Sequence, residues 1–362
     1  MAKRKLRKGI ALKLALLAAL FVVATLGTAF GLNYLFNRPQ DEKKSEESEV
    51  VATPTPTPEP VTTSASLFMV GDALLHTTIE ADASNGDGTY TFSLLDRIGA
   101  IAQNYDLRYY NQETILGGDD LGIHGYPRFN GPQSWGDYML SLGFNLVSTA
   151  NNHCLDMNTY GLENSVNYWK SKEGILMNGT YTSQEDYDAI PVGEINGIRY
   201  AFLSFCHDMN GLQPEQPYYV SCYDGHEEEM LNKVAQAKTM ADIIIGNHPH
   251  CIEPVQWLND GKTICFYALG NIVAAQYDLS KIEMMAALTI NKTTYGDGRI
   301  EISLSDLKTD LMYCYFDANC RNFDVIPFPQ MDDAHLVNCM DVYEQYKAVV
   351  TQMDPSIPIG GF

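Results

Sequence analysis

The stretch FNLVSTANNHCLDMNTYGLENSVNYWK, residues 144–170, combines an apolar run, a polar loop and a segment with helical spacing. The run FNLVSTA is typical of a strand, and the apolar residues of GLENSVNYWK recur at the intervals of an amphipathic helix. The loop between them contains ANNHCLD, residues 150–156, with two amides, an imidazole, a thiol and a carboxylate. This order predicts a strand, loop and helix unit of an α/β fold, with candidate functional groups in the loop.

The same patterns recur on both sides of this stretch. Strands are predicted at 66–70, 107–112, 198–205, 241–246 and 263–269, and helices at 91–105, 134–143 and 226–240. Strands separated by helices of this length indicate an α/β fold whose strands are covered on both faces. After Ala275 the sequence is rich in strand patterns, which we expect to form a second sheet or the far layer of a sandwich. A terminal helix is predicted within 333–350.

The N-terminal region predicts a membrane anchor. Residues 1–13 carry six Lys and Arg side chains, and Leu14–Asn37 contains no charged residue. This uncharged segment is long enough for one membrane span, whereas the apolar core of a cleavable signal peptide has only ~7–15 residues. Because the basic residues precede the span, the positive-inside rule places residues 1–13 in the cytoplasm and the rest outside it. We expect a single-pass protein of the cell membrane, with a cleaved signal peptide as the alternative.

The chain after the anchor divides by composition. Residues 38–65 are polar and then alternate Pro with Thr, which indicates an extended linker. We expect the main domain at 66–330 and a C-terminal helical tail at 331–362. Residues 66–362 carry 15 basic and 39 acidic side chains, a net charge of −24. Such a charge disfavours nucleic acid and anionic lipid as partners held by bulk attraction.

All eight cysteines lie after residue 150, in the part expected outside the cytoplasm. An even number of exported cysteines is typical of disulfides, but the spacing contains no CxxC pair and several cysteines lie in apolar runs. We expect buried thiols, and a bridge from Cys314 to Cys320 or Cys339 stays open. Cys154 and Cys251 each neighbour a candidate site residue, and we expect their thiols to face the core.

Polar residues follow five of the predicted strands, where ligands of open α/β folds bind. These residues are Asp72, the run Asn111 to Glu113, the run Asn151 to His153, the run Cys206 to Asp208, and the run Gly246 to His250. Carboxylate, imidazole and amide oxygen together are typical ligands of Mn²⁺, Zn²⁺ or Fe. Singly, each has an ordinary structural explanation, such as a turn for Asp72 or a surface charge for Glu113. The run His248-Pro249-His250 is more specific, because an extended geometry would place both imidazoles on one face.

Several stretches together resemble the CapA family of capsule or poly-γ-glutamate synthesis proteins, distant relatives of the calcineurin-like metallophosphoesterases. They cover about 66–276 and are MVGDALLH, YNQE, STANNHCLDMNTYGLENSVNYWK, FCHDMNG, IIGNHPHCIEPVQW and ICFYALGNIVAAQ. The resemblance implies a calcineurin-like metallophosphoesterase α/β sandwich, here preceded by one N-terminal transmembrane helix. It also implies a site for two divalent metal ions, with Mn, Zn and Fe as the candidates.

The resemblance assigns roles residue by residue. Asp72 and His250 would bind one ion, Asn152 and His248 the other, and Glu113 would bridge them. His153 would be the catalytic acid, and His207 is a further candidate ligand. Asn271 is either a loop anchor or a substrate-binding residue, while Asp156 and Gly161 are expected to hold the loop and the start of the next helix.

Two departures from the family pattern leave the activity open. Metallophosphoesterases usually begin with Asp-x-His, but position 74 is Leu74, so one imidazole is missing unless His76 reaches the site. Their bridging residue is usually Asp in a GDxxDRG run, whereas Glu113 stands in a different context. Either change could alter the number of metal ions or remove the phosphatase reaction.

These features lead to one expected function and one alternative. We expect a membrane-anchored, extracytoplasmic CapA-type protein for capsule or poly-γ-glutamate synthesis, export or attachment, acting as a metal-dependent hydrolase of phosphoester or polymer linkages. The alternative is a non-catalytic subunit that binds polymer for a membrane polymer synthase. The expected partners are the cell membrane, an anionic envelope polymer such as poly-γ-glutamate and synthase subunits, but not nucleic acid.

Overall fold

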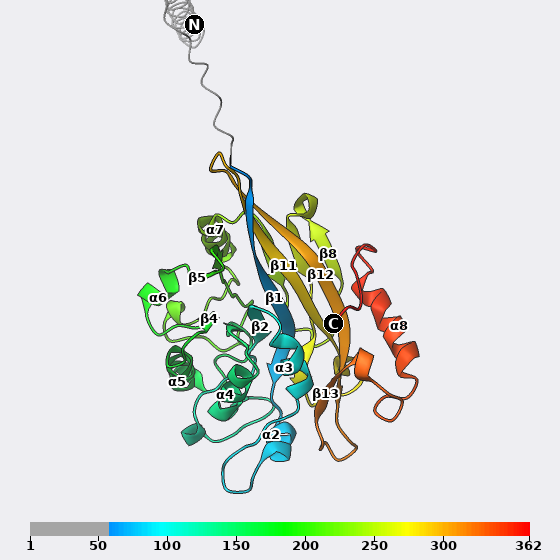
Figure 1. Ribbon diagram of the computed structural model, residues 1–362. Helices are drawn as coiled ribbons and strands as arrows, with labels where there is room; N and C mark the ends of the chain where they lie inside the picture. Colours follow the sequence, from blue (N-terminus) through cyan, green and yellow to red (C-terminus); the bar gives the residue numbers. More distant parts are fainter. Residues whose placement is uncertain (1–57) are drawn as a thin grey trace, which may run out of the picture. The chain divides into compact units, whose positions relative to one another are not determined.

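A mixed sheet of eight strands organises the part of the chain that the computed structural model describes, residues 58–362 (Figure 1). Seven strands are hydrogen-bonded in the order β13, β12, β11, β1, β2, β3 and β4, and β10 pairs with the end of β1. Their bounds are β1 Val61–Leu74, β2 Leu107–Asn111, β3 Leu146–Ser148, β4 Leu176–Asn178, β10 Asn271–Ala274, β11 Ile282–Thr294, β12 Ile300–Tyr315 and β13 Asp324–Pro327. The expected α/β fold is confirmed at this level.

The strands β1 to β4 run parallel and alternate with helices. The helices are α2 Thr77–Ala83, α3 Asp96–Ala102, α4 Gln133–Ser141 and α5 Asn158–Lys170. In α5 the buried residues Leu162, Val166 and Trp169 recur at helical spacing, which is why this segment folds as an amphipathic helix against the sheet. Helix α3 is shorter than predicted, because the Leu94 carbonyl just before it accepts a hydrogen bond from the Val325 amide of β13.

The strands after Ala275 extend the main sheet, so the expectation of a second sheet or of the far layer of a sandwich in this region is wrong. Strand β11 pairs antiparallel with β1 from Val61 to Met69, and β12 and β13 continue on its outer side. This pairing is available because β1 begins at Val61, inside the segment expected as linker, and alternates its side chains between two faces from there. The same strand therefore has antiparallel and parallel neighbours.

Two smaller sheets lie outside this path. Strands β7 Asp242–Ile245, β9 Thr263–Phe266 and β8 Val255–Leu258 form a three-stranded sheet, and β5 Val192–Ile195 with β6 Ile198–Ala201 forms a hairpin. Helix α7 Glu227–Ala237 precedes β7. A strand is present here, but the prediction that it is buried is wrong, because Ile244 is 47% exposed. The apolar run indicated a strand correctly but not its place at the edge of a small sheet.

The core has two large parts, one on each face of β1. Phe68 and Val70 pack in one part with the side chains of α3 and α4, and Leu67 and Met69 pack in the other with β9 and β11. Both faces of β1 are therefore covered, as the sequence predicts. Cys154, Cys206, Cys265, Cys314 and Cys339 are buried, and all eight cysteines, each within 58–362, are free. The prediction of buried thiols is confirmed for these five but not for Cys222, Cys251 and Cys320, which are half-buried, and neither of the bridges considered for Cys314 is formed.

The C-terminal residues pack with the main sheet rather than as a separate tail. Helix α8 spans Cys339–Val350, six residues shorter at its start than the predicted 333–350. Val350 and Ile357 belong to the core around β11 and β12. The Gly360 amide donates to the Thr309 carbonyl of β12 at 2.8 Å.

The expected cytoplasmic segment, anchor and most of the linker fall in residues 1–57, outside the described part of the chain. Within 58–362, none of the helices combines the length and apolar character that a membrane span requires.

Candidate metal centre

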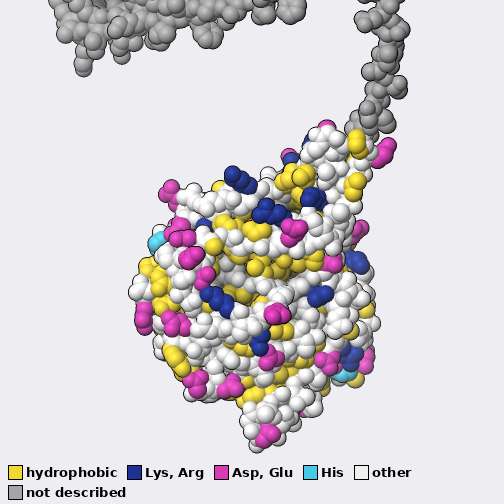
Figure 2. Space-filling model, turned by 60° about the vertical axis from the view of Figure 1, so that its left-hand side comes forward, with side chains coloured by type: hydrophobic (Ala, Val, Ile, Leu, Met, Phe, Trp, Pro, Cys, Tyr) yellow, Lys and Arg dark blue, Asp and Glu magenta, His cyan; other side chains and the backbone are white. Residues whose placement is uncertain are grey.

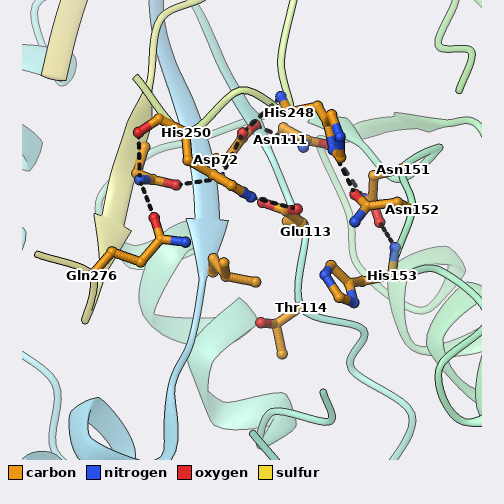
Figure 3. Close-up of polar contacts among 12 residues, drawn as sticks. Asp72, Asn111, Glu113, Thr114, Asn151, Asn152, His153, His248, His250 and Gln276 are labelled. Atoms are coloured by element: carbon orange, nitrogen blue, oxygen red, sulfur yellow. Dashed lines mark hydrogen bonds and ion pairs between the residues drawn. The ribbon is translucent and has the colours of Figure 1, made fainter. Parts of the chain in front are cut away.

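The polar residues at the ends of β1, β2 and β3 meet the loop that follows β7 (Figure 3). Parallel pairing aligns the ends of the first three strands, with Asp72 opposite Asn111 and Asn111 opposite Ser148. The loop after β7 belongs to the smaller sheet and is joined to this edge by its backbone, because the His248 amide donates to Asp72 Oδ2 at 3.0 Å. The site thus lies between two sheets.

Glu113, His248 and His250 form the group that is best suited to bind a metal ion. One ligand atom from each lies within 4.8 Å of the others, and His250 Nε2 is 3.6 Å from Glu113 Oε1. Two ligands of a tetrahedral ion with bonds of ~2.1 Å would be about 3.4 Å apart, so the observed separation suits a shared ion. Figure 3 shows the His250 side chain directed toward Glu113 and the His248 side chain directed toward Asn152 beside it.

Glu113 supplies the strongest sign of a cation. The residue is 1% exposed, and neither carboxylate oxygen has a hydrogen-bond partner within 58–362. Burial raises the pKa of Glu113 well above its usual value, and the negative charges of Asp72 and Asp156 raise it further. A buried, unpaired carboxylate is costly, and a bound cation would supply both its missing partner and its missing countercharge.

Asp72 holds the loop after β7 in place. Its Oδ1 accepts from Asn111 Nδ2 at 2.9 Å, its Oδ2 accepts from the His248 amide, and Oδ2 is 3.6 Å from His250 Nδ1. Burial raises the pKa of Asp72 to about 6, although these two hydrogen bonds lower it. Asp72 therefore contacts both histidine residues without belonging to the three-residue group, and its role as a metal ligand stays a prediction.

His250 is held as the neutral tautomer that a metal ion requires. Its Nδ1 lies 2.9 Å from Asn271 Oδ1, an atom that can only accept, so Nδ1 carries the proton and Nε2 keeps its lone pair toward Glu113. Burial lowers the pKa of His250 to about 4, more than the Asn271 hydrogen bond raises it. Asn271 is 0% exposed and anchors the ring, while its role in substrate binding stays a prediction.

The backbone of the His248-Pro249-His250 run differs from the extended geometry expected from its sequence. His248 has φ 95° and His250 has φ 55°, both in a region that residues other than glycine rarely adopt. The two rings nevertheless lie near each other, with centroids 5.9 Å apart. His248 Nδ1 is 3.3 Å from Asn152 Oδ1, so Asn152 lies beside the candidate group. Such unusual backbone angles are typical of functional sites.

His153 is held by a buried carboxylate. Its Nδ1 lies 2.7 Å from Asp156 Oδ2, and the same oxygen accepts from the Phe129 amide at 2.6 Å. Phe129 also packs edge-on against the imidazole. Asp156 fixes the loop, as expected, but it also orients His153, which the sequence analysis missed. The His-x-x-Asp spacing within one tight loop was the available signal.

Two further histidines are not brought into the group. His76 Nδ1 contacts the Ala275 amide at 3.2 Å, so His76 does not replace the imidazole that is missing at Leu74. Leu74 itself is buried against Phe129. His207 is exposed, and its closest charged partner is Asp208 at 3.1 Å, so the prediction of His207 as a ligand is not supported by the geometry.

The two cysteines beside the site are not placed as nucleophiles. Cys154 is buried in a cluster with Ala150 and Leu155, which agrees with the expectation that it faces the core. Cys251 is half-buried, and burial raises the pKa of its thiol. A raised pKa lowers the fraction of reactive thiolate.

Comparison with known proteins assigns the chain to a family of capsule synthesis proteins. The model of the family described as bacterial capsule synthesis protein PGA_cap matches residues 66–238 and 217–276. These matches cover more than half of the sequence, and the chain belongs to this family. Both sides of the candidate site, from Asp72 to Asn271, lie inside the matched residues.

The chain is also similar to a curated protein over part of its length and to a solved structure at low identity. The PGA biosynthesis protein CapA of Bacillus subtilis (strain 168) is 24% identical over 200 residues, covering 46% of this chain and 52% of the relative. The chain therefore spans about half the length of that relative. A phosphatase from Mycoplasma pneumoniae matches 76% of this chain and 99% of its own, with 12% identity and a TM-score of 0.39. A likeness of that degree says nothing about chemistry.

Proposed function

We propose that this protein is a membrane-anchored, extracytoplasmic capsule synthesis protein that acts as a metal-dependent hydrolase of phosphoester or polymer linkages. The observation that carries this proposal is the buried, unpaired carboxylate of Glu113, which faces the unprotonated Nε2 of His250. Family membership supports a place in capsule or poly-γ-glutamate synthesis, export or attachment.

The metal ion would be held by Glu113, His248 and His250. When bound, a divalent ion supplies Lewis-acid polarisation of a phosphoryl or carbonyl oxygen. Asn271 keeps the His250 ring in the orientation that presents Nε2, and Asp72 fixes the backbone of the loop that carries both histidines. The mixed carboxylate and imidazole set suits Mn²⁺, Zn²⁺ or Fe. If two ions bind, Asp72 and His250 would hold one and Asn152 and His248 the other, with Glu113 shared between them.

His153 would donate the proton to the leaving group. Its Nδ1 is bonded to Asp156, so the proton available for transfer is the one on Nε2 of the protonated ring. The buried Asp156 carboxylate contacts Nδ1 and fixes the direction in which Nε2 points. His153 and Asp156 thus provide a positioned acid, and no third residue is needed.

The anchor and the partners remain proposals from the sequence. The basic residues before Leu14–Asn37 favour a cytoplasmic N-terminus and an exported domain. An anionic envelope polymer would have to overcome the net charge of −24 after residue 65. Figure 2 shows basic and acidic side chains interspersed on one face, without a broad basic surface. Contact with such a polymer would therefore depend on cations bound locally in the site.

One observation favours the non-catalytic alternative. At position 74, where related metallophosphoesterases carry a histidine ligand, Leu74 is buried against Phe129 and Ala274. The site consequently has one imidazole fewer than that pattern requires. In this alternative, the same site would hold a cation that binds polymer for a membrane synthase, without turnover.

The test is hydrolysis of a generic phosphodiester by the purified, metal-stripped full-length chain with and without added Mn²⁺. The proposal predicts Mn²⁺-dependent turnover that is lost when Asp72→Ala and His248→Ala are combined. His335→Ala is the matched control, because His335 is paired with Asp332 far from the candidate group. If turnover is absent, or survives the double substitution, the hydrolase proposal fails. Polymer binding without turnover would then support the alternative.

A further inference from the structure

Glu283 is an ionisable residue inside an apolar strand. It lies in β11 within the run IEMMAAL, and its side chain is 0% exposed. Its neighbours at alternate positions, Met285 and Ala287, belong to the core that packs under α3 and α4. A carboxyl group in such surroundings is unfavourable unless a specific contact requires it.

Glu283 makes that contact with Asn271, the residue that orients His250. Glu283 Oε2 accepts a hydrogen bond from the Asn271 backbone amide, whereas Oε1 has no partner among the described residues. The close approach requires glycine next to Asn271, because a Cβ at Gly270 would lie 2.2 Å from Glu283 Oε2. Gly270 also has φ 76°, which glycine adopts readily. Glu283 therefore fixes the backbone at the start of β10.

The side chain of Asn271 is constrained from the opposite direction. Its Nδ2 faces acceptors only: the His250 carbonyl at 3.4 Å, Gln276 Oε1 at 3.2 Å and the Ser280 carbonyl at 3.3 Å. The amide therefore cannot reverse without placing its carbonyl oxygen against these acceptors. Only Oδ1 remains to face His250 Nδ1.

We propose that Glu283 is a positioning residue that acts through Asn271 to hold His250 in the tautomer with a free Nε2. Glu283 does not contact the three candidate ligands, and its carboxyl oxygen acts as a fixed acceptor beneath Asn271. The expected effect of Glu283 on metal affinity rests on the proposed function. Its expected effect on the tautomer of His250 does not. Outer contacts of this kind set the affinity of metal sites.

The first measurement is the tautomer of His250 in the metal-free full-length chain, read from the nitrogen spectrum of the protein labelled with ¹⁵N-histidine. His250→Gln assigns the signals. The wild type is expected to show a protonated Nδ1 and an unprotonated Nε2. Glu283→Met, which removes the acceptor at similar volume, is expected to give a mixture of both tautomers, and Glu283→Gln, which keeps an acceptor, is expected to restore the wild-type spectrum.

The second measurement is the Mn²⁺ dissociation constant of the same variants by titration calorimetry. Glu283→Met is expected to weaken binding about 10–100-fold, and Glu283→Gln by about threefold at most. The control is Asp310→Met, which removes another buried carboxyl group from the adjacent strand β12, where Asp310 bonds to Tyr343 instead. It should leave both the tautomer and Mn²⁺ affinity unchanged.

The proposal is overturned if Glu283→Met keeps both the wild-type tautomer and the wild-type Mn²⁺ affinity. It is also overturned if Glu283→Gln fails to restore either. If Glu283→Met does not fold, Glu283→Asp replaces it. This variant shortens the side chain by one methylene and should give the same mixture of tautomers and the same loss of Mn²⁺ affinity. If the wild type does not bind Mn²⁺ at all, the proposed function fails, and the tautomer measurement still decides the role of Glu283.

Discussion

His250 Nε2 lies 3.6 Å from Glu113 Oε1, which is too long for a hydrogen bond and suitable for two ligands of one ion. The Nε2 lone pair of His250 therefore faces a buried carboxyl group that has no hydrogen-bond partner among the described residues. Such an arrangement is unfavourable by itself and becomes favourable when a cation lies between the two groups.

The first prediction concerns Glu113→Gln. The substitution removes the buried charge and one ligand, so Mn²⁺ should bind at least about tenfold more weakly. In the presence of a chelator, the variant should be no less stable than the wild type, since the amide does not carry the desolvated charge of Glu113. Calorimetric titration and thermal unfolding measure the two effects. A loss of stability in chelator with unchanged Mn²⁺ affinity would show that Glu113 is a structural residue instead.

Much of the edge formed by the ends of β1, β2 and β3 can be predicted from the sequence, because its residues follow local patterns. The strands ending at Asn111 and Ser148 have clear apolar runs, and the parallel arrangement then aligns their ends. The contact between Asn271 and Glu283 could not be predicted, because it depends on the close approach of β10 and β11 at Gly270. An apolar run likewise does not specify its neighbour, which is why the burial of β7 and the sheet that contains β11 were predicted wrongly.

The second prediction concerns the pH dependence of Asp72. Because burial raises the pKa of Asp72 from its usual value to about 6, the folded, metal-free protein binds a proton at Asp72 that the unfolded chain releases near pH 4. The contribution of Asp72 to stability is therefore present below pH 4 and is lost as the pH rises toward 6. Its size is about 3 kcal/mol.

Comparison with Asp72→Asn isolates this contribution. In chelator, the free energy of unfolding of the wild type relative to Asp72→Asn should fall between pH 4 and pH 7. His250 has a lowered pKa, which gives the opposite slope, and both His250 and Glu113 sense the charge of Asp72, so the comparison is made in the background of Glu113→Gln and His250→Gln, where neither group titrates. Denaturant titrations at several pH values provide the measurement. A difference that is constant or rises with pH contradicts the burial of a proton-binding Asp72.

The third prediction concerns the two residues of the proposed acid. His153→Ala should lower kcat by about 10²–10⁴-fold, which is the usual contribution of a general acid. Asp156→Asn should lower kcat by a smaller factor, because His153 keeps its imidazole but loses the carboxylate that fixes the direction of its ring. His153→Ala should not change Mn²⁺ affinity, since His153 does not belong to the candidate group. Equal losses of Mn²⁺ affinity and kcat would instead indicate a collapse of the site.

The most direct test of the metal centre is anomalous diffraction from crystals of the protein grown with Mn²⁺. The account predicts a peak between Glu113, His248 and His250, about 2.0–2.4 Å from a carboxylate oxygen of Glu113 and from His250 Nε2. A structure with Mn²⁺ in the crystal but no peak at these residues would contradict it.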